Sequence, residues 1–201
     1  GIPKYVELFC DNQALTIDKM YDFVFSENSL FIDEGRNLLI TEFGKNYGTY
    51  FSILSEIANG HYTQGEIESA LGGTAIGGYL SKLENVYNLI TRERPIFAKP
   101  GTKKNVRYVI GDNFLNFWFK YIEQNRSYIE LQNFDDLRQL AKADYPTYSG
   151  RVLEKYFKQK LAETGGFKEI GSWWETKSSI GKQRINSYEI DIVALKSSGK
   201  K

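Results

Sequence analysis

Apolar residues recur at helical spacing through the first part of the chain, and strand-like alternation appears only later. The clearest early case is residues 16–25, where four apolar side chains fall on one side of a helix: Ile17, Met20, Tyr21 and Val24. The pattern predicts a helical segment over residues 1–45. That segment contains neither a glycine-rich phosphate loop nor a catalytic motif.

Between residues 46 and 110 the pattern predicts three short helices and then two strands. Thr63 and Glu66 form a capping box at the start of the second helix, and Gly72-Gly73 ends it. Two extended runs then flank the polar segment 99–104, as in a hairpin. Helices joined by a tight glycine turn and followed by a hairpin are typical of a winged helix-turn-helix, which reads the major groove of DNA.

Cations in this module are the candidate DNA contacts. One lies on the third helix and four lie on the hairpin: Lys82, Lys99, Lys103, Lys104 and Arg107. The alternative is that the three-helix unit packs against a neighbouring domain and never meets DNA. It stays open because Lys82 is the only cation of the third helix and Glu84 balances its charge.

The densest apolar stretch is residues 114–122, in which only Asn116 and Lys120 are polar. Its apolar surface runs almost all the way round, so the helix must be buried on most sides. We expect Asp112 to cap this helix and its aromatic residues, Trp118 among them, to join the three-helix module to the C-terminal domain. The stretch is far shorter than the roughly 20 residues of a membrane span, so no membrane partner is expected.

The last third of the chain predicts a helix and strands. Residues 150–164 form the helix, with Glu154 in its first turn and five apolar residues expected to point inward: Val152, Leu153, Tyr156, Phe157 and Leu161. Residues 167–174 predict one or two strands, and residues 188–195 a denser strand.

Two carboxylates, Glu189 and Asp191, share one face of that denser strand, which otherwise has the composition of a buried strand. Buried like charges raise each other's pKa unless a cation lies between them, and a hard ion such as Mg²⁺ would relieve the repulsion. Metal-assisted phosphodiester hydrolysis uses such clusters. The alternative is that Glu189 lies in solvent at the strand end and Asp191 accepts ordinary hydrogen bonds.

Composition narrows the classes of protein. Of 201 residues, 41% are apolar and 15% aromatic, which excludes a disordered chain. The 26 basic and 25 acidic residues give a net charge of +1, so no global field favours nucleic acid or an anionic membrane. The single cysteine, Cys10, excludes an internal disulfide and favours the cytoplasm. Because the chain starts at Gly1 and its only methionine is Met20, we expect a fragment of a longer protein.

Six segments resemble the C-terminal half of the archaeal-type P-loop ATPases, which are AAA+/STAND-like. They are Gly-Ile-Pro-Lys-Tyr at 1–5, Tyr-Phe-Ser-Ile-Leu at 50–54, Ile-Gly-Gly-Tyr-Leu at 76–80, Asn-Phe-Leu-Asn-Phe-Trp-Phe at 113–119, Ile-Gly-Ser-Trp-Trp at 170–174 and Glu-Ile-Asp-Ile-Val-Ala at 189–194.

The resemblance implies an α+β chain in three parts. Residues 1–45 would end the ATPase lid, residues 46–110 would be the winged helix-turn-helix, and residues 111–201 a truncated α/β domain resembling PD-(D/E)xK restriction-endonuclease-like nucleases. The implied partner is the upstream ATPase domain, which would bind ATP. The chain lacks G-x-x-x-x-G-K-[ST] and should not hydrolyse ATP by itself.

This sequence matches only part of the motif of the nuclease class. Glu154 matches the helical Glu of the class, Asp191 matches the metal-binding strand Asp, and Glu189 is a weaker candidate. The D/E-x-K pair is missing, and the literal E-x-K at residues 175–177 precedes Asp191, in the wrong order. We therefore expect weak Mg²⁺ binding through Asp191 and Glu154 and no DNA cleavage. Two functions stay open: an effector arm of the ATPase that binds DNA, with or without cleaving it, and a catalytically silent interaction module that regulates the ATPase or holds a partner protein.

Overall fold

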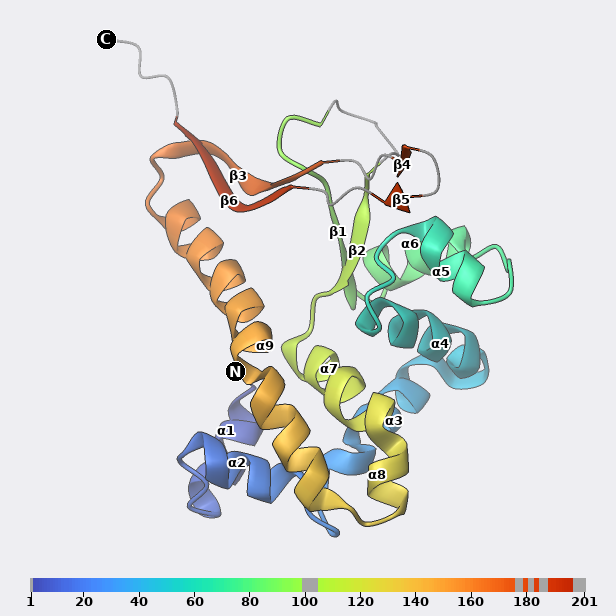
Figure 1. The fold of residues 1–201 in the computed structure, drawn as a ribbon, viewed down its shortest axis with the longest axis vertical. Helices are drawn as coiled ribbons and strands as arrows, with labels where there is room; N and C mark the ends of the chain where they lie inside the picture. The colour runs from blue at the N-terminus through green and yellow to red at the C-terminus, as the bar shows by residue number, and fades with distance from the viewer. Residues whose placement is uncertain (1, 99–104, 176–178, 181–182, 185–187, 197–201) are drawn as a thin grey trace. The chain divides into compact units, whose positions relative to one another are not determined.

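The computed structural model describes the chain except for residues 1, 99–104, 176–178, 181–182, 185–187 and 197–201 (Figure 1). The described chain is a mixed α+β structure, mostly helical with small antiparallel sheets, which confirms the predicted α+β class. It divides into two compact units. The first unit contains residues 1–92 and 108–144, and the second contains residues 93–107 and 145–201.

The first unit is built mainly of helices. It opens with α1 (Pro3–Asp11), α2 (Ile17–Val24), α3 (Phe31–Phe43), the 3-10 turn η1 (Gly44–Asn46), α4 (Tyr47–Ala58), α5 (Gln64–Ala70) and α6 (Gly77–Asn85). A two-stranded sheet follows, formed by β1 (Ile90–Glu93) and β2 (Arg107–Ile110), whose terminal residues Glu93 and Arg107 are counted with the second unit. Next come α7 (Asn113–Phe117), the π-helical turn η2 (Trp118–Ile122), the 3-10 turn η3 (Glu123–Asn125), α8 (Arg126–Glu130) and the start of α9 (Phe134–Glu163). None of the described helices is both long and apolar enough to cross a bilayer.

Helix starts in the first unit follow the predicted caps. The Thr63 hydroxyl accepts a hydrogen bond from the Glu66 amide at 3.3 Å, and the Glu66 carboxylate accepts one from the Thr63 amide at 3.0 Å. The Asp112 carboxylate accepts a hydrogen bond from the Leu115 amide at 2.7 Å. Both predicted caps are therefore confirmed, because a cap depends only on side chains three residues apart.

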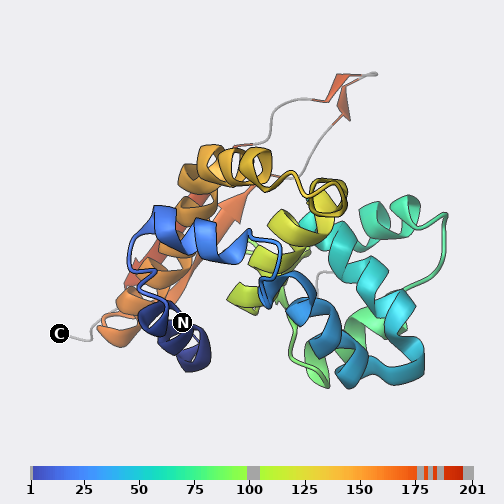
Figure 2. The same cartoon turned by 90° about the horizontal axis from the view of Figure 1, so that it is seen from below.

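The core of the first unit forms around the segment 113–122. Trp118 is fully buried, and its indole N–H donates to the Ile32 carbonyl on α3 at 3.1 Å. Its ring also meets Phe51 of α4 edge-on at 6.1 Å. Figures 1 and 2 both show this segment beside α3 and α4. Trp118, which belongs to the predicted C-terminal domain of residues 111–201, thus packs against α4 of the three-helix module and also against α3, where Gly35 leaves space for the indole.

The second unit combines the later part of α9, residues 145–163, with two antiparallel strand pairs. Strand β3 (Phe167–Trp174) pairs with β6 (Glu189–Lys196), and β4 (Ser179–Ile180) pairs with β5 (Gln183–Arg184). In the longer pair Gly171 faces Val193 and Trp173 faces Ile190, which leaves Ser172 opposite both Asp191 and Ile192. The β6 strand therefore carries a bulge of one extra residue at Asp191 and Ile192.

The apolar side of α9 does not point inward as predicted. Val152, Leu153, Tyr156 and Phe157 are exposed, whereas Glu154 and Lys158 point to Ser172 on β3. The reason is geometric, since residues four apart share one side of a helix and the Glu154–Lys158 side is the one held against the strand. Strand β6 is not the buried strand predicted either, because Ile190 remains about half exposed.

Candidate functional site

A polar cluster in the second unit contains Glu154, the acidic residue predicted on the helix. Lys158 lies one helical turn further along α9, and its ammonium group pairs with the Glu154 carboxylate and with the Ser172 hydroxyl. Ser172 is buried on β3, and its hydroxyl donates to Glu154 Oε1 at 3.3 Å. Glu154 is thus held beside the sheet by a cation and a hydroxyl. Sequence reasoning missed Lys158, although its i, i+4 spacing from Glu154 is the signal for such a pair.

A second group in the same unit joins Arg107 to the sheet. Its Nη1 lies 2.6 Å from Glu189 Oε1, and its guanidinium carbon lies 4.3 Å from the centroid of the Trp174 ring. Trp174 and Glu189 are register partners on β3 and β6, so they present this pair of contacts side by side. Of the predicted DNA contacts, Arg107 is therefore engaged by a carboxylate and an aromatic ring of its own unit.

The carboxyl group of Glu93, at the end of β1, is influenced by the charges of the Glu154–Lys158 pair and of the Arg107–Glu189 pair. Burial among neighbouring protein atoms raises the pKa of the Glu93 carboxyl above its ordinary value, although part of the residue still reaches solvent. Lys158 and Arg107 oppose that rise in pKa, and Glu154 and Glu189 reinforce it. These two cations of the second unit, Lys158 and Arg107, are thus each paired with a carboxylate of their own, Glu154 and Glu189.

Asp191 is exposed, whereas the sequence pattern predicted a buried carboxylate. It is exposed on the β6 bulge, opposite Ser172, the residue that contacts Glu154. Since Asp191 is not buried, the argument that it needs a cation to offset desolvation does not apply. Across the described residues no group of three or more His, Cys, Asp or Glu side chains could hold a metal ion. The residues described at this site do not fit a complete Mg²⁺ centre.

The remaining predicted DNA contacts are Lys82 on α6 and three lysines of the segment between β1 and β2. Lys82 is exposed on α6, whereas Lys99, Lys103 and Lys104 lie outside the described residues. The buried side of α6 is formed by Leu80 and Leu83. Its exposed side carries small and polar residues: Gly78, Ser81, Lys82 and Asn85. Sequence reasoning identified Lys82 but not this wider polar face.

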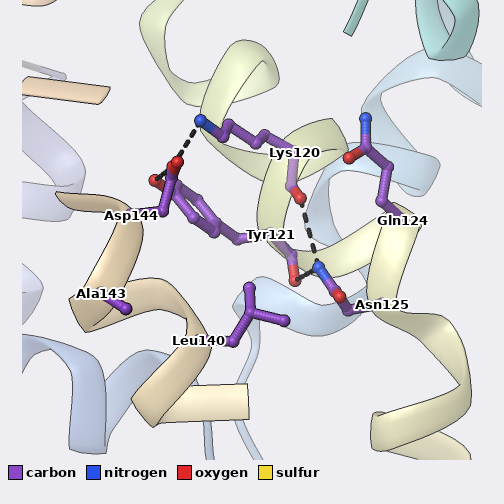
Figure 3. A pocket seen from close by; sticks show the side chains of 7 residues that line it. All are labelled: Lys120, Tyr121, Gln124, Asn125, Leu140, Ala143 and Asp144. Carbon is purple, nitrogen blue, oxygen red and sulfur yellow. Dashed lines mark hydrogen bonds and ion pairs between the residues drawn. The ribbon is translucent and has the colours of Figure 1, made fainter. Parts of the chain in front are cut away.

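The first unit also has an open pocket of about 550 Å³ (Figure 3). It lies between η2–η3 and the start of α9, and its lining is Lys120, Tyr121, Gln124, Asn125, Leu140, Ala143 and Asp144. The Tyr121 hydroxyl donates to the Asp144 carboxylate, and Lys120 pairs with the same group. Asn125 donates to the carbonyls of Lys120 and Tyr121 at 3.2 and 3.1 Å, which satisfies part of the widened π-helical turn. Three of the polar groups around this pocket therefore bond to one another.

Comparisons with known proteins identify a domain without an assigned role. Residues 118–201 match the DUF234 family model, described as archaea bacterial proteins of unknown function. An uncharacterized protein of Methanocaldococcus jannaschii is 38% identical over 162 residues, which cover 76% of this chain and 34% of that protein. The chain thus spans about a third of the length of this curated relative. No solved structure matches the chain.

Proposed function

We propose that this chain is the DNA-binding, nuclease-like effector region of a larger P-loop ATPase and that it does not cleave DNA by itself. The observation that carries the DNA-binding part is the order of α4, α5, α6, β1 and β2, combined with the exposed polar side of α6. The ATPase part rests on the resemblance of the six sequence segments. The nuclease-like part rests on Glu154 beside the β3–β6 pair.

Three helices followed by a two-stranded sheet is the element order of a winged helix-turn-helix. The sheet is tied to the helices by backbone bonds, from the Tyr108 amide to the Tyr62 carbonyl at 2.7 Å and from the Gly111 amide to the Leu89 carbonyl at 2.8 Å. Such bonds would hold α6 at a fixed angle to the sheet, as a groove-reading helix requires. In this proposal α6 is the recognition helix.

The exposed side of α6 suits the major groove of DNA. Ser81, Lys82 and Asn85 supply the hydroxyl, ammonium and carboxamide groups that hydrogen-bond to base edges and phosphates. Gly78 has open space where a side chain would stand, so DNA could approach the backbone closely. Arg92, on β1 of the same unit, is already paired with Glu84 at 2.6 Å.

Neutralising Lys82, Lys103 and Lys104 together should weaken duplex binding in a salt-dependent way. Removing each lysine–phosphate interaction should flatten the slope of log affinity against log salt by about 0.9, because fewer counterions are released. Fluorescence anisotropy of a labelled duplex over a range of NaCl concentrations measures that slope. Arg107 is left intact, since its replacement would also disturb Glu189 and Trp174 in the second unit.

The matched control for this experiment removes three lysines of the N-terminal segment: Lys4, Lys19 and Lys45. It lowers the net charge equally, so a purely global charge effect would change both slopes alike. The proposal fails if the variant without Lys82, Lys103 and Lys104 keeps the salt slope of the parent chain, or if the parent chain binds no duplex at low salt. Either result would show that the three-helix module packs against protein and does not bind DNA.

The nuclease-like part of the proposal predicts no cleavage. Glu154 is occupied by Lys158 and Ser172, and the motif supplies no D/E-x-K lysine to orient an attacking water. We expect the chain to leave supercoiled plasmid intact in Mg²⁺ or Mn²⁺ and to bind these ions only weakly, as measured by calorimetry. Metal-dependent nicking that disappears in Asp191→Ala would contradict this prediction.

A further inference from the structure

Asn85, the last residue of α6, carries a carboxamide that its own helix orients. Its Nδ2 donates to the Ser81 carbonyl at 2.9 Å and lies 3.3 Å from the Ser81 hydroxyl oxygen. The two residues are four positions apart, so they share one side of the helix, and both are exposed. The carboxamide is therefore held in a defined direction while it faces solvent. A group arranged in advance loses little conformational freedom on binding, which favours recognition of a ligand.

The hydrogen bonds of this carboxamide leave part of its capacity unused. A carboxamide has two N–H donors and one oxygen that accepts. The Ser81 carbonyl takes one donor, and the second N–H has only the longer contact with the Ser81 hydroxyl. Within the part of the chain that the structure describes, no donor reaches Asn85 Oδ1. One donor and one acceptor thus lie side by side at the surface.

An adjacent donor and acceptor complement adenine. In the major groove of DNA, adenine presents the N7 acceptor beside the N6 amino donor. Guanine presents two acceptors there, cytosine an amino donor, and thymine an acceptor and a methyl group. The open donor and acceptor of Asn85 can both be satisfied by adenine at once, whereas each other base satisfies only one of them. The carboxamide therefore suits one base.

The rest of the exposed side of α6 lets a base edge approach. Four residues follow the spacing i, i+3, i+4 and i+7 of one helix side: Gly78, Ser81, Lys82 and Asn85. A Cβ at Gly78 would meet no atom within 4 Å, so this side is open. The one acidic residue in the sequence of α6, Glu84, pairs with Arg92 at 2.6 Å, which offsets its repulsion of phosphates.

We propose that Asn85 reads an adenine in the major groove and thereby gives the chain a base preference. The adenine N6 amino group donates to Asn85 Oδ1, and the second Nδ2 N–H of Asn85 donates to adenine N7. The bond to the Ser81 carbonyl stays in place and holds the plane of the carboxamide. This inference rests on the proposed DNA binding and adds to it the residue and the base that determine specificity.

The test starts from a pool of DNA duplexes with a random central segment, from which the full chain selects the sequences that it binds best. We expect adenine at one fixed position of the selected duplex. Replacing this A·T pair by G·C should weaken binding of the parent chain by about 5-fold to 150-fold, the usual discrimination of a bidentate base contact. Asn85→Ala should bind both duplexes alike, as measured by fluorescence anisotropy.

Two further measurements separate a base contact from a structural effect. A duplex with 7-deazaadenine at the selected position lacks the N7 acceptor, so it should bind the parent chain more weakly and leave the affinity of Asn85→Ala unchanged. The slope of log affinity against log salt should be the same in Asn85→Ala as in the parent chain, because a contact between a carboxamide and a base releases no counterions. The matched control is Asn37→Ala, which removes an exposed carboxamide from α3 and should keep the preference for adenine. Circular dichroism melts verify that both variants fold.

The outcomes distinguish failure of this inference from failure of the proposed DNA binding. No duplex binding by the parent chain at low salt would refute both. Duplex binding without a preferred adenine, or a preference that survives in Asn85→Ala, would refute base recognition by Asn85 and leave the DNA binding standing. A flatter salt slope in Asn85→Ala would also overturn the inference, because the substitution would then act through phosphate contacts such as that of Lys82.

Discussion

Replacing Trp118 by alanine is expected to lower the free energy of unfolding by about 3 to 5 kcal/mol, the usual cost of truncating a buried aromatic side chain. The indole is fully buried between α3 and α4, and the substitution also removes its hydrogen bond to the Ile32 carbonyl. That bond contributes about 1 kcal/mol, and without it the Ile32 carbonyl keeps only the Arg126 guanidinium as a side-chain donor, at 3.4 Å. Because a domain is stable by only about 5 to 15 kcal/mol, the first unit would lose much of its stability.

Urea unfolding followed by far-ultraviolet circular dichroism measures this loss without relying on the removed fluorophore. Leu131→Ala is the control, since Leu131 is 80% exposed and its truncation should change stability by no more than about 0.5 kcal/mol. A loss below about 1 kcal/mol for Trp118→Ala would mean that the indole lies at the surface and that α3 and α4 do not enclose it.

Features that depend on neighbouring residues could be predicted from the sequence. The Thr63–Glu66 box and the Asp112 cap each join side chains three residues apart, so their spacing is sufficient evidence. The long-range partner of Trp118 could not be predicted in the same way. A dense apolar run shows that a helix is buried, but it does not show which element buries it, and here the partner includes Gly35 of α3.

Only part of the candidate site could be predicted from the sequence, because most of its contacts join residues that are far apart in the chain. The resemblance pointed to Glu154, yet its bond to Ser172 depends on which side of α9 faces the sheet. Hydrophobic periodicity predicted the opposite side, because it assumes that apolar residues are covered within the chain itself. The setting of Asp191 depends on a one-residue bulge, which an alternating pattern does not reveal. The pair between Arg107 and Glu189 joins residues 82 positions apart, beyond the reach of any local pattern.

Substituting Gly35 by alanine should destabilise the protein, although alanine is the better helix former by about 1 kcal/mol. A Cβ at this position would stand 2.2 Å from Cδ2 and 2.5 Å from Cγ of Trp118, closer than carbon atoms can approach. The indole is fully buried, so it can yield only by disturbing its own packing, and overpacking of this kind costs about 1 to 3 kcal/mol. Urea unfolding measures the change.

The control for Gly35→Ala is Gly48→Ala in α4, where a Cβ would meet no atom within 4 Å. That substitution should be neutral or stabilising by up to about 1 kcal/mol, as expected when the backbone becomes less flexible without a clash. Repeating Gly35→Ala in the Trp118→Ala background completes the test, because the clash then has no partner and most of the cost should disappear. The resulting coupling energy should be of the order of 1 to 3 kcal/mol. Additive effects of the two substitutions would show that Gly35 and Trp118 do not touch, and that another element of the first unit determines the position of the indole.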